Sequence, residues 1–351
     1  MTQGVPPYLP AGADLYGDLL EVEGRSETGL RTYLPGLLMA SVAAAAAAWL
    51  SDNYGAPLML MGLLLGLSFN FTNQDARLHP GLGFASKTLL RLGIVLLGFR
   101  ITIWQMAELG WTGFAAVAVI LGLVLGSGVL IARRCNLSAA FGALAGGAVA
   151  ICGASAALAF AGVLGEKRIS QAQLTIVLVA IAAASAVAMP LYPMIGALLG
   201  FSEQQIGFLA GAAIHDVAQA LGAGYSHSEA AGASATIVKL TRVALLAPVL
   251  TLVALAFLSG GDEQKAKVPI PWFVGGFLLM VLVNSFVPLP PAFAQGAGKL
   301  ATALLVLAIT ATGIRSPLHM LMTMGWRSAM PVVGSSLVAL LLALAAAKAV
   351  F

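Results

Sequence analysis

The sequence predicts an all-α polytopic membrane protein. Hydrophobic residues make up 60% of the chain and charged residues only 9%, whereas soluble domains carry about 25% charged residues. Apolar runs of about 20 residues, long enough to cross a bilayer as helices, recur along the chain. With so few charges, the net charge of +4 reflects topology more than a binding partner, and nucleic-acid binding is not expected.

Two regions are expected: a polar N-terminal segment over 1–33 and a single transmembrane domain over 34–351. The acidic residues of the first segment favour a solvated tail over a cleavable signal peptide. In the second region the apolar runs predict about eleven spans, with approximate ends. They cover 34–50, 57–72, 86–104, 111–131, 139–163, 172–198, 204–224, 230–258, 271–287, 297–314 and 328–350.

Gly, Pro and polar residues interrupt several of these spans, so discontinuous helices made of two halves are expected. If the N-terminus is cytoplasmic, most basic residues of the loops fall on the inside, as the positive-inside rule requires. Lys167 and Arg168 oppose this orientation. The forty glycines suit close helix packing in lipid.

An internal repeat joins two distant parts of the chain. LGIVLLGFR at 92–100 is similar to LAITATGIR at 307–315, and GW at 110–111 recurs with the same spacing at 325–326. The copies lie an odd number of spans apart and so run in opposite directions. Inverted repeats are a common plan of transporters, with the binding site where the repeats meet.

A second similarity, between 142–156 and 207–221, has a different spacing. It is interpreted here as convergence of Gly- and Ala-rich sequence.

Three polar residues lie within the apolar stretch 207–224: His215, Asp216 and Gln219. Asp216 is the only carboxylate placed inside a predicted span. A charge at the bilayer centre costs about 2.5–3.5 kcal/mol on insertion scales, so it is usually paired or functional. Either Asp216 or His215 changes charge during transport, or Asp216 forms a structural ion pair with a nearby cation.

The next stretch, 235–248, carries Lys239 and Arg242 on one helical face. Asp216 could neutralise only one of these two cations. A net positive pocket would remain, which favours an anionic substrate. The alternative is that one or both side chains extend to the membrane interface.

Small residues at 152–157 would permit a break in a third span. Gly153 and Ser155 lie there, and the half-helix that follows would offer free backbone N–H groups to an anion. Tight helix packing explains the same residues. Cys152 with His215 also raises the alternative of a nucleophile, but a buried Cys is more often a small apolar filler.

Arg100 and Arg315 occupy equivalent places in the two repeats, each after a Gly at the end of an apolar run. They are expected at opposite membrane faces, as interfacial anchors or gate residues. The sequence contains no phosphate-binding loop and no zinc-ligand spacing, so no cofactor and no metal are expected.

Three motifs, GAAIHDVAQALGAG, VKLTRVALLAP and ICGASAA, resemble the YeiH-like sulfate exporter family. The resemblance covers nearly all of the chain from about residue 34, including GLLLGLSFN and LLRLGIVLLGFR. It implies a bacterial inner-membrane protein, distantly related to sodium/proton antiporters and bile-acid symporters. Those proteins use inverted repeats, crossed broken helices and a moving core domain. Asp216 stands where the family pattern has Glu, which shortens the reach of the carboxylate.

The expected function is a secondary transporter, an exporter of a small inorganic anion such as sulfate or sulfite, with proton or sodium coupling. Lys239, Arg242, Gly153, Ser155, Cys152 and Gln219 are the predicted substrate-binding residues. His215 and Asp216 are assigned to proton coupling or to an ion pair.

Two alternatives remain open: a cation/proton antiporter that uses Asp216, and an intramembrane enzyme that uses Cys152 or Ser155 with His215. Membrane lipid is the expected surrounding partner, and the sequence is also compatible with a homo-oligomer.

Overall fold

The computed structural model describes residues 30–165, 168–257, 272–316 and 326–350. Within these ranges all regular secondary structure is helical. Seven of the described helices are long and apolar enough to cross a membrane, and shorter apolar helices accompany them. The prediction of an all-α polytopic membrane protein is therefore confirmed. Of the predicted polar segment 1–33, residues 1–29 lie outside the described residues.

The helices follow one another in chain order without a strand among the described residues. They are α1 (Leu30–Tyr54), α2 (Leu58–Ser68), α3 (His79–Phe84), α4 (Leu90–Leu97), α5 (Ile103–Glu108), α6 (Gly110–Arg134), α7 (Ala139–Ala150), α8 (Ala154–Leu164), α9 (Gln171–Leu198), α10 (Glu203–Ala213), α11 (Val217–His227), α12 (Glu229–Ala244), α13 (Leu246–Phe257), α14 (Trp272–Phe286), α15 (Pro291–Ile314) and α16 (Trp326–Val350). Short 3-10 or π turns fill Asn70–Gln74, Ala76–Leu78, Ala85–Leu89 and Gly98–Arg100.

Local sequence accounts for many helix starts. Ser138, Ser170, Ser202 and Ser228 each accept a hydrogen bond from a backbone N–H in the first turn of the helix that follows. Such caps satisfy donors that a helix start leaves unpaired. These serines therefore set where α7, α9, α10 and α12 begin.

One predicted span, 86–104, begins too late in the chain. The helical run extends from Ala76 to Arg100 and includes a π turn at Ala85–Leu89. Pro80 lies in the first turn of α3, where a missing N–H costs nothing, so the run begins earlier than hydropathy indicates. Ile101 is extended, and Thr102 then starts the separate helix α5 through a capping box.

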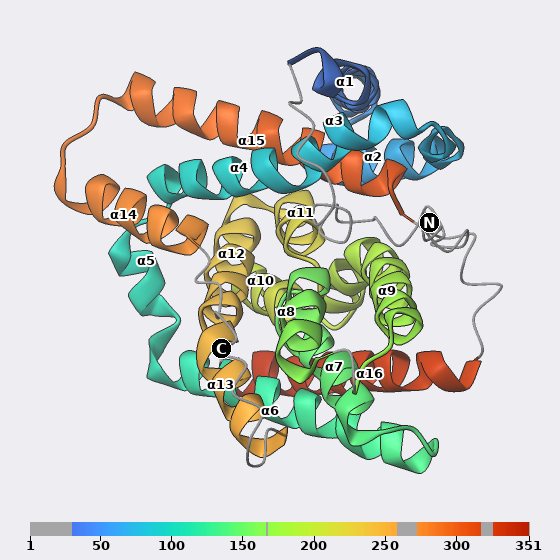
Figure 1. Cartoon of the computed structure of the whole chain (residues 1–351). Helices are drawn as coiled ribbons and strands as arrows, with labels where there is room; N and C mark the ends of the chain where they lie inside the picture. Colours follow the sequence, from blue (N-terminus) through green and yellow to red (C-terminus); the bar gives the residue numbers. More distant parts are fainter. Residues whose placement is uncertain (1–29, 166–167, 258–271, 317–325, 351) are drawn as a thin grey trace.

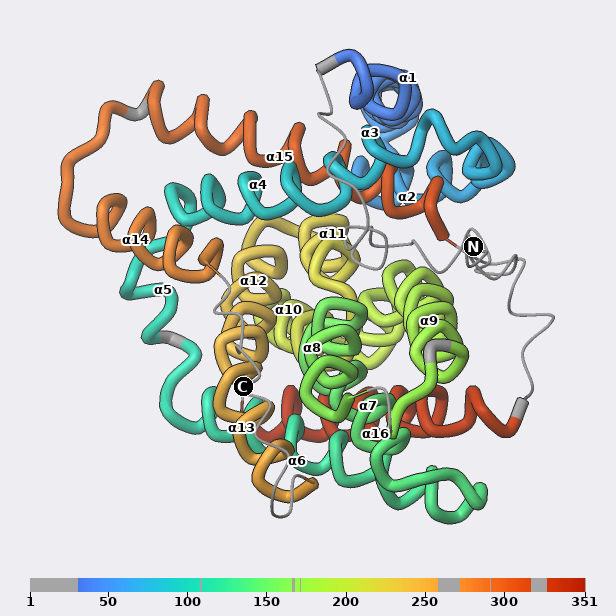
Figure 2. The backbone as a smooth tube through the Cα atoms, viewed as in Figure 1, coloured from blue at the N-terminus to red at the C-terminus, as the bar shows by residue number. Residues whose placement is uncertain are grey.

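The helices form two groups, visible in Figures 1 and 2. The flanking bundle consists of α1–α4, α14 and α15, drawn along the top of Figure 1. The central bundle consists of α6–α13 and α16. α5 connects the two, and α2 and α15 of the flanking bundle contact α11 of the central bundle.

The repeated segments pack against each other in opposite directions. In Figure 1 α4 runs from α3 toward α5, while α15 runs back from α14. Gly93 lies beside Leu304 in the middle of the pair, and Gly298, near the start of α15, lies beside Arg100. At the other end the Arg315 guanidinium donates to Ser86 Oγ at 3.0 Å. The two copies are therefore inverted, as the sequence predicts.

Two asparagines bind this pair in a reciprocal way. Asn70, after α2, donates to the carbonyl of Ile314 at 2.7 Å and to that of Ser316, just past α15. Asn284, at the end of α14, donates to the carbonyl of Ile101, just past α4, at 3.2 Å. Each repeat thus supplies an amide that satisfies carbonyls at the end of the other repeat's helix.

Glycines bring the helices of the central bundle close together. A Cβ at Gly128 of α6 would lie 2.5 Å from the Cα of Gly146 in α7. A Cβ at Gly211 of α10 would lie 2.7 Å from the carbonyl oxygen of Ala235 in α12. Only Gly allows these approaches, which hold α7 and α10 in place next to the interruptions described below.

Candidate functional site

The first interruption separates α7 from α8. α7 ends at Ala150 and α8 begins at Ala154. Gly153 has φ 69° and ψ −122°, a conformation that residues with a side chain rarely adopt. Its N–H donates to the carbonyl of Ala148 at 2.9 Å. The sequence-based prediction of a break at Gly153 matches this position.

The second interruption separates α10 from α11. Ile214 and Asp216 are extended, and the Asp216 carboxylate caps α11 by accepting from the N–H of Gln219 at 3.0 Å. The N–H of Asp216 donates to Ser185 Oγ of α9 at 3.2 Å. Hydrogen bonds to neighbouring groups, not Pro or Gly, hold this break open.

The two interruptions meet at Lys239 of α12, which is fully buried. The Lys239 ammonium donates to the carbonyl of Ile151 at 2.9 Å, to that of Ile214 at 2.7 Å and to that of His215. A Cβ on Gly153 would lie 3.6 Å from the carbonyl group of His215. One side chain therefore joins the ends of two half-helices.

Arg242, one turn further along α12, repeats this role. Its three guanidinium nitrogens donate to carbonyls at the ends of α7 and α10: Val149 at 2.6 Å, Ala150 at 2.7 Å, Gly211 at 2.8 Å, Ala212 at 2.7 Å and Ile214 at 3.2 Å. Helix C-termini carry about −0.5 elementary charge each. The two buried cations therefore complement two negative helix ends, and both side chains are buried inside the protein.

Asp216 forms no ion pair with Lys239 or Arg242 in the described part of the chain. Its carboxylate is only partly buried and serves the start of α11 instead. The centre therefore brings two basic side chains together with one carboxylate that pairs with neither of them. We call the meeting of the two interruptions around Lys239 and Arg242 the crossing.

His215 and Gln219 are both buried beside the crossing, each 1% exposed. His215 Nε2 lies 2.8 Å from Ser336 Oγ of α16, and the Ser336 hydroxyl donates its proton to the carbonyl of Val332 at 2.7 Å. His215 Nδ1 and Gln219 Oε1 have no hydrogen-bond partner among the described residues. Buried polar atoms are usually paired, so these two atoms are available to a ligand or water.

The start of α8 differs from that of α11, because no side chain caps it. Ser155, in its first turn, is exposed, and Cys152 is buried beside the N–H of Ala156. Neither Cys152 nor Ser155 is hydrogen-bonded to His215, whose Nε2 faces Ser336. The pairing that a nucleophilic enzyme would need is thus not formed by these residues.

Arg100 and Arg315 lie at opposite ends of the antiparallel pair α4 and α15, away from the crossing. Arg100 forms an ion pair of 3.0 Å with Glu229 at the start of α12. Arg315 is 4% exposed and contacts Ser86. Equivalent positions of the repeat therefore have unlike surroundings.

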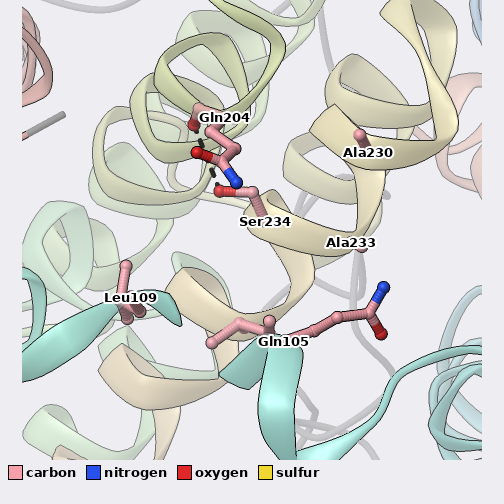
Figure 3. Close-up of a pocket in the computed structure, with 7 residues that line it drawn as sticks. Gln105, Leu109, Gln204, Ala230, Ala233 and Ser234 are labelled. Atoms are coloured by element: carbon pink, nitrogen blue, oxygen red, sulfur yellow. Dashed lines mark hydrogen bonds between the residues drawn. The ribbon is translucent and has the colours of Figure 1, made fainter. Parts of the chain in front are cut away.

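A small cavity of about 80 Å³ lies between α5, α10 and α12. Figure 3 draws the residues that line it. Gln105, Gln204 and Ser234 line it with apolar neighbours, and Ser234 Oγ donates to the carbonyl of Gln204 at 3.2 Å. No charged side chain lines this cavity among the described residues. It does not include the crossing and offers little to an anion.

Sequence reasoning missed the hydroxyl groups that support the site. Ser185 and Ser336 are buried in Ala-rich helices, and their residue type alone gives no signal. The similarity between 142–156 and 207–221, interpreted as convergence, falls on the two interrupted helices. That similarity was the available signal for a crossing.

A family model described as Conserved hypothetical protein 698 matches residues 35–332. The UPF0324 membrane protein TauZ of Paracoccus denitrificans is 42% identical, over 83% of this chain and 88% of its own. UPF0324 membrane proteins of Chlorobaculum tepidum and Rhizobium meliloti are 40% and 39% identical, covering 84% and 82% of this chain and 84% of each relative. No solved structure matches the chain significantly. The chain therefore belongs to the UPF0324 family of membrane proteins, which is also the family of the YeiH-like proteins.

Proposed function

We propose that this protein is a secondary transporter that exports a small inorganic anion, with sulfate and sulfite as the first candidates. The observation that carries the proposal is the crossing, where two buried cations face a single carboxylate between interrupted helices. Discontinuous helices at a repeat interface are a recurring substrate site of secondary transporters.

The anion would bind at the start of α8. The N-cap residue Gly153 has no side chain to cap α8, and the Ser155 hydroxyl is exposed in its first turn. Helix starts attract anions through their backbone N–H donors and through the dipole. Cys152 and Gly153 would form the floor of this site, since they immediately precede α8.

Lys239 and Arg242 would act mainly through their charge. Their donors already bind carbonyls, so direct contact with the anion would require it to displace a carbonyl. In a medium of low dielectric constant a buried charge acts over several ångströms without contact. Asp216, His215 and Gln219 would then couple the anion to a proton, because they combine a carboxylate with two unpartnered acceptor atoms.

A cation/proton antiporter is the second candidate. The same two unpartnered atoms, His215 Nδ1 and Gln219 Oε1, suit a cation or proton beside Asp216. The two basic side chains at the crossing oppose this alternative.

The substitution Ser155→Asp separates the two candidates. A carboxylate in the first turn of α8 favours the helix by about 0.3–1 kcal/mol, so the fold should be retained. It would repel an anion and attract a cation. Ser170→Asp is the matched control, because it places the same charge at the start of α9.

The assay is flux in proteoliposomes with radiolabelled sulfate, sulfite or sodium, with and without a pH gradient. We expect anion flux that Ser155→Asp abolishes and Ser170→Asp preserves. Sodium flux that survives or increases in Ser155→Asp would favour the antiporter. Anion flux that is normal in Ser155→Asp would refute the proposed site.

A further inference from the structure

A second cavity, which is lined by charged side chains, lies at the boundary between the two bundles. It has a volume of about 550 Å³ and opens to the surface between the end of α4 and the starts of α12 and α15. Arg100 and Lys299 line it together with Glu229, Gln295 and Thr302. Two cations, one carboxylate, an amide and a hydroxyl thus face one space.

We propose that this cavity is an oxyanion-binding site, in which Arg100 exchanges Glu229 for the bound anion. The guanidinium group of Arg matches the paired oxygens of an oxyanion geometrically. Lys299 forms no ion pair within the described residues, so its charge is available to the same ligand.

The ion pair between Arg100 and Glu229 is suited to such an exchange. Its side chains are 32% and 70% exposed, respectively. Exposed ion pairs contribute only about 0.2–1 kcal/mol, so an anion that engages both Arg100 and Lys299 competes readily with the single carboxylate of Glu229.

The location connects this site to the crossing. Glu229 begins α12, and Lys239 lies on the same helix roughly 15 Å further along, at 1.5 Å per residue. The equivalent arginine of the other repeat, Arg315, is buried and bonded to Ser86. The cavity therefore marks the end of the repeat pair that is open, where an anion would enter or leave if the proposed function is correct.

The test is equilibrium binding of radiolabelled sulfate and sulfite to the purified full-length protein in detergent at low ionic strength. All variants carry Ser155→Asp, which disables the proposed site at α8 and leaves this cavity intact. Glu229→Gln should tighten binding roughly two- to fivefold, because an exposed competitor is lost. Arg100→Gln and Lys299→Gln should each weaken it about tenfold.

Asp75→Asn is the matched control. Asp75 and Arg77 form another exposed pair of 2.7 Å, and neither residue lines the cavity, so freeing Arg77 should leave the affinity unchanged. The gain from Glu229→Gln should vanish when Arg100→Gln is also present. Equal affinities in all variants, or absence of binding by every probe, would overturn the proposal.

The phosphate of an anionic lipid shares this chemistry with a free anion. A parallel series therefore adds phosphatidylglycerol. Displacement of sulfate that depends on Arg100 would support the site and assign it to a lipid headgroup. Binding that phosphatidylglycerol does not affect would support the site and assign it to the free anion.

Discussion

Replacing Lys239 by Met should destabilise the protein strongly, because its ammonium group holds three carbonyls from two half-helices. Each buried acceptor left unpaired destabilises the protein by about 1–3 kcal/mol. Replacing Lys239 also removes the desolvation penalty of a buried charge, which offsets part of this loss. The net loss expected for breaking such a buried arrangement is about 3–5 kcal/mol.

The measurement is thermal unfolding of the detergent-solubilised protein. In a chain of this size 1 kcal/mol shifts Tm by about 2 °C, so Lys239→Met should lower Tm by roughly 6–10 °C. Lys348→Met is the control, since Lys348 is exposed near the end of α16. A Tm of Lys239→Met equal to that of the control would refute the view that Lys239 joins the two interruptions.

Three further predictions concern the interruptions and the repeat. Gly153→Ala should lower Tm by more than Gly165→Ala. Both positions have positive φ, but only at Gly153 would the new Cβ also lie 3.1 Å from Ile181. Equal decreases in Tm would show that this contact is irrelevant. Asp216→Asn should keep the cap on α11 and hence the Tm, yet remove the pH dependence of flux. Asp75→Asn should leave the pH dependence of flux unchanged, because Arg77 lowers the pKa of Asp75 to about 2 and that carboxylate stays ionised at neutral pH. Asn70→Ala should destabilise the end of α15 by about 1–3 kcal/mol, because the carbonyls of Ile314 and Ser316 lose their donor. Hydrogen exchange near Ser316 should become faster. Unchanged exchange would show that Asn70 does not stabilise this helix end.

Hydropathy and repetition were sufficient for the general plan. Apolar runs predicted the helices, and the match of 92–100 with 307–315 predicted the inverted pair α4 and α15. The ends of α3 and α4 were missed, because Pro80 and the π turn at Ala85–Leu89 are not visible in hydropathy. Helix ends depend on individual caps and prolines, which a window average removes.

The site was predicted in part. Gly153 signalled one interruption through its residue type, whereas the break at Ile214 depends on Ser185 and Lys239, which are distant in sequence. The spacing of three residues predicted that Lys239 and Arg242 share one face of a helix, and both lie at the crossing. Spacing alone did not show that their donors bind backbone carbonyls and leave Asp216 to cap α11.

The arrangement of Lys239 and Arg242 on one helix has a mechanical consequence. Because both side chains of α12 bind the ends of α7 and α10, a displacement of α12 must carry both half-helices with it. The crossing would then move as one rigid unit, in which the positions of Lys239 and Arg242 relative to the two helix ends stay constant. A movement of that unit would change its position against the flanking bundle, where α11 contacts α2 and α15.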